Sequence, residues 1–187
     1  MTLHISREYY VLFTVLTALS STHGGDISTF SAPPEGYEWF ESTDGVGSFL
    51  KPDGWFVTEE SSGNTKALFI TRENIEADGG YLTGMSVNQI NDFSKTYSGE
   101  PSQYAVFAAA ELASTGEVLL QDVVTCDAYD MNILRVKLSS SDIIIHYIII
   151  GMDSTDQVYI LMFEAPESLW EQNEQYGEQI LGLFILG

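Results

Sequence analysis

The side chains that could carry out catalytic or metal chemistry are few in this sequence. It has three histidines, and His146 is the one that lies outside the amino-terminal region. A multi-histidine zinc site cannot be built from one histidine, and the single cysteine, Cys126, does not complete the ligand set. His146 stands between isoleucines, a setting typical of a hydrogen-bonded core residue rather than of a ligand or a general base. We therefore expect no histidine-based catalytic or metal site.

Cys126 ends a largely apolar, strand-like run, Val123–Cys126. A small buried side chain is the common role of a free cysteine in such a run. A nucleophilic cysteine would need a base beside it, and the sequence offers few candidates. Because Cys126 is alone, it cannot form a disulfide within the chain. We expect a structural role for this residue.

The 27 acidic residues keep calcium binding and paired-carboxylate chemistry open as alternatives. Asp153–Asp156 offers several oxygen ligands but lacks the glycine and the distal glutamate of an EF-hand loop, so a solvated hairpin turn is the simpler interpretation. Glycoside hydrolysis is neither supported nor excluded, because so many acids always allow some carboxylate pair. Nucleophile-elbow, P-loop and dinucleotide-binding patterns are absent, and Asp44–Gly47, with two glycines, is expected to be a turn. We expect no catalytic residue, no metal ligand and no cofactor, and residues that would hold a small ligand stay undetermined.

The charge of the chain limits its partners. The 27 acidic residues stand against 7 basic ones, which gives a formal net charge of −20. Such a surface repels phosphate backbones and anionic lipid headgroups, so we expect neither nucleic-acid binding nor anionic-membrane binding. It would attract a protein partner with a basic surface. The alternative is that it serves only solubility, since the acids are dispersed rather than run together.

The amino-terminal region has the pattern of a secretory signal peptide. Tyr9–Leu19 is an apolar block shorter than the ~20 residues that a membrane-spanning helix needs. We place the cleavage near Ser20, which gives a signal peptide over residues 1–20 and export to the periplasm or the cell exterior. An uncleaved anchor and a disordered leader are the alternatives, whereas no cysteine follows the block, which excludes a bacterial lipoprotein. Residues 21–36 have the Ser, Thr, Gly and Pro content of a linker.

Residues 37–187 have the periodicity of one hairpin-rich α+β domain. Turn sequences such as Pro52–Gly54 separate short apolar stretches, and links this short join antiparallel neighbours. Ile143–Ile150 is apolar on both faces apart from His146, which predicts a central strand covered on both sides. Strands are expected at Val46–Leu50, Trp55–Glu59, Lys66–Arg72, Leu82–Ile90, Glu117–Cys126, Met131–Leu138, Asp142–Ile150 and Gln157–Phe163.

Two helices are expected to cover the sheet. Glu100-Pro101 opens the first, because proline suits the first helical position. The second is expected to begin at Pro166, where Ser168 and Glu171 have the spacing of a capping box. Apolar side chains recur along it as one stripe that reaches Phe184, and its polar face carries Glu and Gln without Lys or Arg. This pattern favours packing on the sheet over binding to a membrane surface.

Several local motifs resemble the PsbP family and, more broadly, the Mog1/PsbP-like fold. They are Asp44-Gly45-Val46 leading through Phe49 to Pro52-Asp53-Gly54-Trp55, the strand at Leu68–Ile70, the helix after Pro101, and Phe163–Trp170. The resemblance covers approximately residues 37–186 and implies a central, mainly antiparallel sheet flanked by helices, an αβα sandwich. The family's roles are non-enzymatic: extrinsic subunits and assembly factors of photosystem II, and a Ran-binding nuclear protein in the Mog1 branch.

The sequence differs from PsbP itself in its charge and in its targeting signal. It has few basic residues and no recognisable chloroplast or lumen-targeting signal, so we expect a bacterial exported relative rather than a subunit for water oxidation. No functional residue of the family can be carried over by position. We expect a non-catalytic exported domain that binds, or helps to assemble, a protein with a basic surface. A small-ligand or calcium carrier, or an enzyme with a pocket between sheet and helix, is the alternative.

Overall fold

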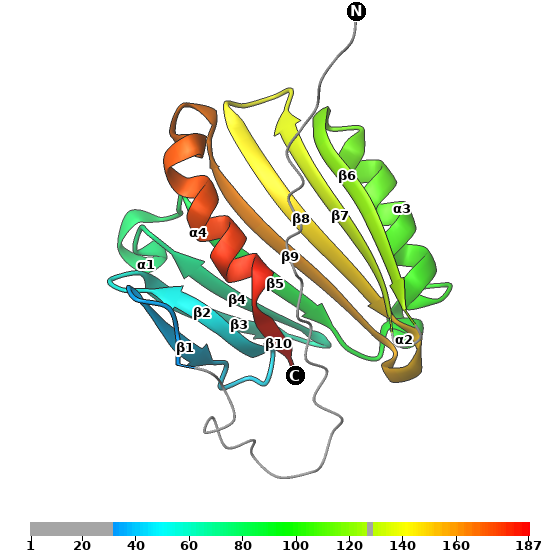
Figure 1. The fold of residues 1–187 in the computed structure, drawn as a ribbon. Helices are drawn as coiled ribbons and strands as arrows, with labels where there is room; N and C mark the ends of the chain where they lie inside the picture. The colour runs from blue at the N-terminus through cyan, green and yellow to red at the C-terminus, as the bar shows by residue number, and fades with distance from the viewer. Residues whose placement is uncertain (1–31, 127–128) are drawn as a thin grey trace, which may run out of the picture.

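A seven-stranded antiparallel sheet forms the centre of the domain in a computed structural model, which describes residues 32–126 and 129–187, the side chain of Cys126 excepted (Figure 1). The strand order is β3-β4-β5-β9-β8-β7-β6, and each neighbouring pair is antiparallel. This is the expected α+β class. The strands are β3 (Phe56–Ser62), β4 (Thr65–Thr71), β5 (Gly84–Ile90), β6 (Gly116–Cys126), β7 (Tyr129–Leu138), β8 (Ile143–Met152) and β9 (Gln157–Pro166).

Helices cover both faces of this sheet (Figure 1). On one face α3 (Pro101–Ala113) packs on β7 and β8, and on the other α4 (Trp170–Gly182) packs on β9. Each helix seals a separate hydrophobic cluster, so the sheet is the middle layer. The short helices are α1 (Ile75–Asp78), α2 (Phe93–Thr96) and the 3-10 turns η2 (Asp153–Thr155) and η3 (Glu167–Leu169).

A second sheet of three strands lies on the α4 side and was not predicted. Its order is β1-β2-β10, formed by β1 (Tyr37–Glu41), β2 (Gly47–Pro52) and β10 (Phe184–Leu186). The prediction that Phe184 continues the last helix is wrong. β10 gains ladder hydrogen bonds with β2, and the Phe184 ring is buried with its centroid 6.2 Å from that of Phe49.

The expected helix starts have different outcomes. α3 begins at Pro101 with Glu100 as its N-cap, as predicted. The capping box at Ser168 is wrong, because β9 continues to Pro166 and α4 begins only at Trp170, without a side-chain cap. The ladder with β8 holds the chain extended up to Pro166, and the next amide, that of residue 167, donates to the Asp142 carbonyl at 3.0 Å.

The strand β8 is central and covered on both faces, as predicted. Its alternate side chains enter opposite clusters, since successive residues of a strand point to opposite faces. Ile144 and Ile148 lie on the α4 side, and Ile145 and Ile149 on the α3 side. Burial of such side chains stabilises the fold by roughly 2 kcal/mol each, so β8 is the main anchor for both layers.

α4 approaches the sheet closely because Gly177 has no side chain. A Cβ atom at this position would lie 2.5 Å from the ring of Phe163, which is fully buried. The Phe163 ring also packs edge-on against Trp170, with 6.1 Å between the ring centroids. The helix is therefore seated on β9 at the one turn where only glycine fits.

Some expectations concern parts of the chain outside the described residues. These are the signal peptide, residues 1–20, most of the linker, residues 21–36, and the side chain of Cys126. Where the structure describes the chain, none of its helices has both the length and the apolar character required to cross a membrane.

Candidate binding sites

One long edge of the large sheet carries exposed apolar side chains. β6 pairs with β7 on one side, and no described strand pairs with its other side. A bulge between Val118 and Leu120 interrupts the ladder. Four apolar side chains of β6 are between 41% and 54% exposed, namely Val118, Leu119, Leu120 and Val123. We call these four residues, together with Val106 of α3, the apolar edge.

α3 presents two exposed apolar side chains in different directions. Ala105 and Ala109 face the sheet and are buried. Because successive helical residues are about 100° apart, Val106 and Phe107, which are 57% and 60% exposed, lie on different flanks of this buried stripe. Phe107 lines a pocket on the β9 side. Val106 lies on the other flank, towards β6, and extends the apolar edge.

The opposite edge strand, β3, is polar and partly covered. The hydroxyls of Ser42 and Thr43 donate to the Glu59 carboxylate, and that of Ser61 donates to the Asp44 carboxylate. Asp44 belongs to the turn between β1 and β2 that the sequence predicts. Polar side chains and covering loops protect sheet edges against unwanted pairing. The two edges of the sheet therefore differ, and β6 is the one open to an apolar partner.

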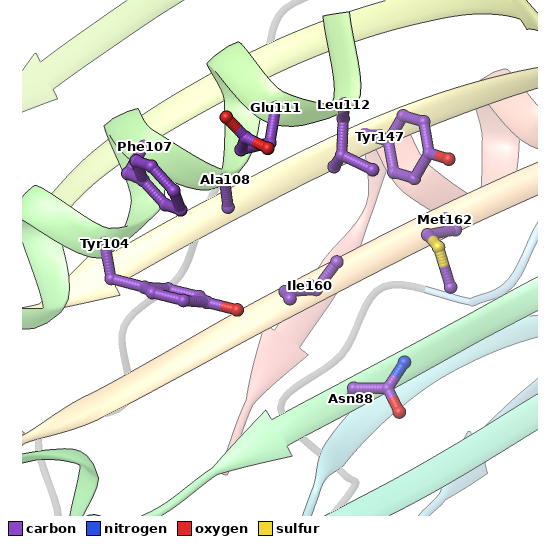
Figure 2. A pocket seen from close by; sticks show the side chains of 9 residues that line it. All are labelled: Asn88, Tyr104, Phe107, Ala108, Glu111, Leu112, Tyr147, Ile160 and Met162. Atoms are coloured by element: carbon purple, nitrogen blue, oxygen red, sulfur yellow. The ribbon is translucent and has the colours of Figure 1, made fainter. Parts of the chain in front are cut away.

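A pocket of about 330 Å³ opens between α3 and the sheet (Figure 2). α3 packs mainly on β7 and β8, so the sheet extends beyond the helix towards β5. The pocket lies along the side of α3, above the strands that the helix leaves uncovered. The floor consists of Asn88 from β5, Tyr147 from β8 and Met162 from β9. The wall on the helix includes Tyr104 and Glu111. The lining is mostly apolar with a few polar groups, which is the composition of small-ligand sites.

A buried carboxyl group lies on the same face as the pocket. Glu164 is two residues beyond Met162 on β9, so both side chains point to the α3 face. Burial raises the pKa of Glu164, although a hydrogen bond from Tyr81 opposes this rise. Burial and the Glu164 charge also raise the pKa of the Tyr147 hydroxyl. The open part of this face therefore holds acidic and phenolic groups.

His146 lies on the opposite face of the sheet, away from this pocket. It is 9% exposed, and its Nδ1 atom lies 3.3 Å from an Nη atom of Arg135. Burial and the Arg135 charge lower the pKa of His146 to about 4, so the ring is neutral at neutral pH. Arg135 also forms an ion pair with Glu174 and lies over the Trp170 ring, 5.1 Å from its centroid. The structure places His146 in this core cluster beneath α4.

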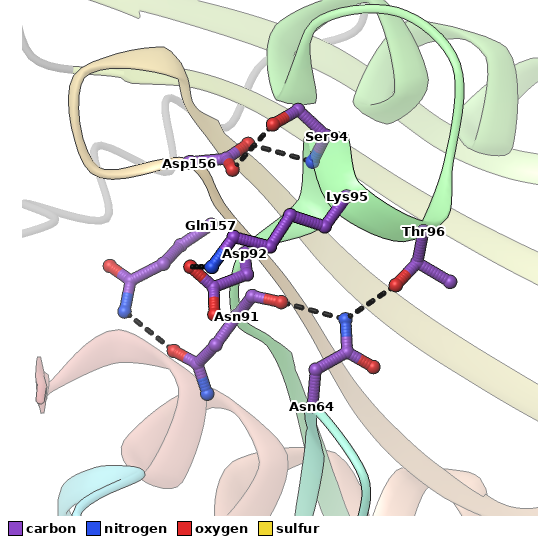
Figure 3. A network of polar contacts seen from close by, with 8 residues as sticks. All are labelled: Asn64, Asn91, Asp92, Ser94, Lys95, Thr96, Asp156 and Gln157. Atoms are coloured by element: carbon purple, nitrogen blue, oxygen red, sulfur yellow. Dashed lines mark hydrogen bonds and ion pairs between the residues drawn. The ribbon is translucent and has the colours of Figure 1, made fainter.

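The acidic turn between β8 and β9 caps two helices instead of being merely solvated. Asp156 accepts from the backbone amide and the hydroxyl of Ser94 at 2.9 and 2.7 Å, at the start of α2 (Figure 3). Asp153 accepts both corresponding groups of Ser102, in the first turn of α3, at 2.8 Å. Among the described residues, no group of three His, Cys, Asp or Glu side chains could hold a metal ion. The candidate calcium oxygens therefore have a structural use.

The network in Figure 3 also joins this turn to the end of β5. Asn64, in the β3–β4 turn, donates to the Asn91 carbonyl at 2.7 Å and to the Thr96 hydroxyl at 3.1 Å. Gln157 donates to the Asn91 side chain at 2.8 Å. These contacts fix the position of α2 and of the turn that leads into α3, and hence one end of the pocket wall.

A scan against protein-family models and a search of the curated proteins match nothing. Solved structures do match. The chain is similar to cyanobacterial PsbP from Synechocystis sp. PCC 6803, with 15% identity and a TM-score of 0.49 over 90% of this chain and 99% of that one.

Two further solved structures are similar. One, from Bacteroides thetaiotaomicron, has 10% identity and a TM-score of 0.45, and the match covers 81% of this chain. This chain spans about half, 49%, of the length of that protein. The other is the Pseudomonas aeruginosa protein of unknown function PA94, with 13% identity and a TM-score of 0.38 over 76% of this chain and 92% of that one. At these identities and TM-scores the similarities assign the chain to no family.

Neither candidate site was located by reasoning from the sequence. The run Val118–Leu120 resembles a buried strand, and only the strand order makes β6 an edge. The pocket residues Asn88, Tyr104 and Tyr147 come from distant segments and form no local motif. Composition does not mark the edge either, because the predicted strand Glu117–Cys126 is rich in large apolar side chains, whereas a strand at an exposed edge usually carries charges.

Proposed function

We propose that this chain is a non-catalytic protein-binding domain that captures an extended segment of another protein along β6. The observation that carries the proposal is the apolar edge. An unpaired edge strand offers a row of backbone donors and acceptors, and a peptide that adds as a further strand satisfies them. The exposed side chains on both faces of β6, such as Leu120 and Val123, would then be covered by the apolar side chains of the added strand.

The charge of the chain supports a partner segment that is basic as well as apolar. β6 carries Glu117 and Asp122, both exposed, and the whole chain has a net charge of −20. A partner with Lys or Arg beside its apolar residues would be drawn towards this edge and would pair with these carboxylates. A second copy of the same acidic chain would instead be repelled. We therefore propose a basic partner protein rather than self-association.

Three further observations support the non-catalytic and exported parts of the proposal. His146 and the pocket lie on opposite faces of the sheet, so the histidine does not act at the pocket. The resemblance of residues 37–186 to the PsbP family points to an accessory or assembly role without chemistry. The signal-like Tyr9–Leu19 segment supports export, and mass spectrometry of the mature protein tests this by finding its amino terminus near residue 21.

Site-specific photo-crosslinking of the full chain in its host cells tests the proposed edge. Benzoylphenylalanine replaces Val123 on β6, and the matched control carries it in place of Glu60, an exposed residue of β3. We expect a discrete adduct with another protein from position 123 that is absent at position 60. Leu120→Lys in the same chain should remove this adduct, because it places a positive charge against the basic added strand.

Three outcomes contradict the proposal. The first is the absence of any adduct at position 123. The second is an identical set of adducts from both positions, which indicates random collisions. The third is an adduct of twice the mass of the chain, which makes β6 an interface between two copies.

A further inference from the structure

The pocket beside α3 combines aromatic rings with acidic groups. Tyr104, Phe107 and Tyr147 contribute rings, and Glu111 contributes a carboxyl group. Among the described residues that line the pocket, none is Lys, Arg or His. Its volume of about 330 Å³ is at the small end of ligand pockets, which span roughly 300–1,000 Å³. The cavity suits a small molecule of about one ring and a short chain.

Two aromatic rings of α3 line the pocket, and they differ in how firmly their neighbours hold them. The Tyr104 ring is held by neighbours, with its centroid 5.0 Å from that of Phe93 and 6.0 Å from that of Tyr97. Phe107 is 60% exposed and contributes a ring face that the core does not use. In Figure 2 these two rings lie at one end of the pocket, and Tyr147 and Met162 lie at the other. A ligand would therefore find aromatic faces without displacing core contacts.

The electrostatic environment favours a positive ligand. Glu111 lies on the helix side between the two ends of the pocket (Figure 2). Glu164, two residues beyond Met162 on β9, adds a second carboxyl group on the same sheet face, outside the lining itself. Aromatic faces and carboxylates both attract ammonium groups, and the net charge of −20 raises the local concentration of cations.

We propose that this pocket binds a small organic cation with an apolar body, such as an alkylamine or arylalkylamine. The ammonium group would lie near Glu111 and against the faces of Tyr104 and Phe107. The apolar body would lie on Ile160 and Met162, with the Asn88 amide available to any polar substituent. This site is separate from β6, so its occupancy is independent of the protein-binding role proposed above.

Other ligand classes fit the pocket less well. An anion would meet the carboxyl group of Glu111 and find no basic side chain in the lining. A purely apolar molecule would cover Asn88 and the tyrosine hydroxyls without giving them a hydrogen-bond partner, and buried polar groups without partners reduce affinity. Charge complementarity therefore selects the cation.

Titration of the full chain with three probes of one shape tests the proposal. The probes are phenylbutylamine, phenylbutanol and phenylbutanoate, which are positive, neutral and negative, and binding is followed by NMR chemical shifts. We expect saturable binding of the amine with shifts at the lining residues, an affinity about tenfold above that of the carboxylate, and an intermediate affinity for the alcohol.

Two matched pairs of variants locate the site. Glu111→Gln should weaken amine binding about fivefold and leave the alcohol unchanged, whereas Glu178→Gln, which removes the same charge from an exposed position on α4, should change neither. Phe107→Ala should weaken both ligands about fivefold, whereas Val106→Ala, on the other flank of α3, should not. Tighter binding of the carboxylate, no saturable binding of the amine, or equal effects of the paired variants would overturn the proposal.

Discussion

Replacing Gly177 with alanine tests how closely α4 is seated on the sheet. The new Cβ would lie 2.5, 2.8 and 2.9 Å from three atoms of the Phe163 ring, closer than carbon atoms normally approach. Phe163 is fully buried and packs against Trp170, so the ring cannot move aside without disturbing the core. Overpacking of this kind costs about 1–3 kcal/mol, and the severity of the contact favours the upper value.

The same substitution also stabilises the helix, and this gain offsets part of the loss from overpacking. Alanine in a helix interior is about 1 kcal/mol more favourable than glycine. The net expectation for Gly177→Ala is therefore a loss of about 2 kcal/mol of unfolding free energy. With a urea slope of about 2 kcal/mol per molar, the denaturation midpoint should fall by about 1 M. Tryptophan fluorescence measures it, since Trp170 lies in the affected region.

Gly182 provides the matched control, because it ends the same helix and an added Cβ there meets no atom within 4 Å. Gly182→Ala should leave the midpoint unchanged or raise it slightly. In the Gly177→Ala background, Phe163→Leu should cost less than it does in the wild type, because the smaller side chain makes room for the methyl group. A Gly177→Ala protein as stable as the wild type would refute the close seating of α4 on β9.

Further predictions concern titration, capping and the apolar edge. The pKa of His146 is about 4 in the fold and about 6.5 when unfolded. The unfolded chain binds the proton first, so stability should fall as pH drops from 6.5 towards 4, by about 2–3 kcal/mol. His146→Gln should flatten this part of the stability curve, and an unchanged slope would contradict the neutral buried ring. Asp153→Ala and Asp156→Ala should each lower the unfolding free energy by about 1 kcal/mol, whereas Ser154→Ala in the same turn should lower it little. Added calcium should not raise the melting temperature of the wild type, and a rise would indicate a cation site. Val123→Lys should change the unfolding free energy by less than about 0.5 kcal/mol, because this side chain is 54% exposed; a larger loss would show that Val123 belongs to the core and is not available to a partner.

Local sequence signals located most of the fold. The predicted strand from Lys66 to Arg72 corresponds to β4 at Thr65–Thr71, and the one from Gln157 to Phe163 to most of β9. These agreements arise because turn residues and side-chain alternation act within a few residues of one another. The start of α3 at Pro101 was found for the same reason.

Features that depend on distant partners could not be found in this way. Asp153 and Asp156 cap helices whose first turns are 51 and 62 residues away in the chain, so no local capping pattern marks them. β10 becomes a strand only because β2 offers it a free edge. Its three residues carry no signal that outweighs the preceding helix.

The binding surfaces show the same limit. β6 and β8 are both rich in apolar residues, yet β8 is buried and β6 is an edge, because the pairing order of whole hairpins decides which strand ends the sheet. The pocket exists because α3 stops short of β5, which depends on where the helix docks. Reasoning from the sequence therefore could not place the surfaces that remain uncovered.

The adjacency of β5 and β9 has a consequence for the rate at which the molecule becomes native. β3–β5 and β6–β9 are two meanders, each made of contacts between sequence neighbours. They meet at a seam where Gln89 donates to the Tyr159 hydroxyl, 70 residues away, and closing so long a loop costs chain entropy that a short hairpin does not. The two meanders therefore form first. The contacts between β5 and β9 form last, because they require both meanders. Ile133→Val, in the hairpin of β6 and β7, should therefore slow refolding, whereas Val87→Ala, at the seam, should mainly speed unfolding.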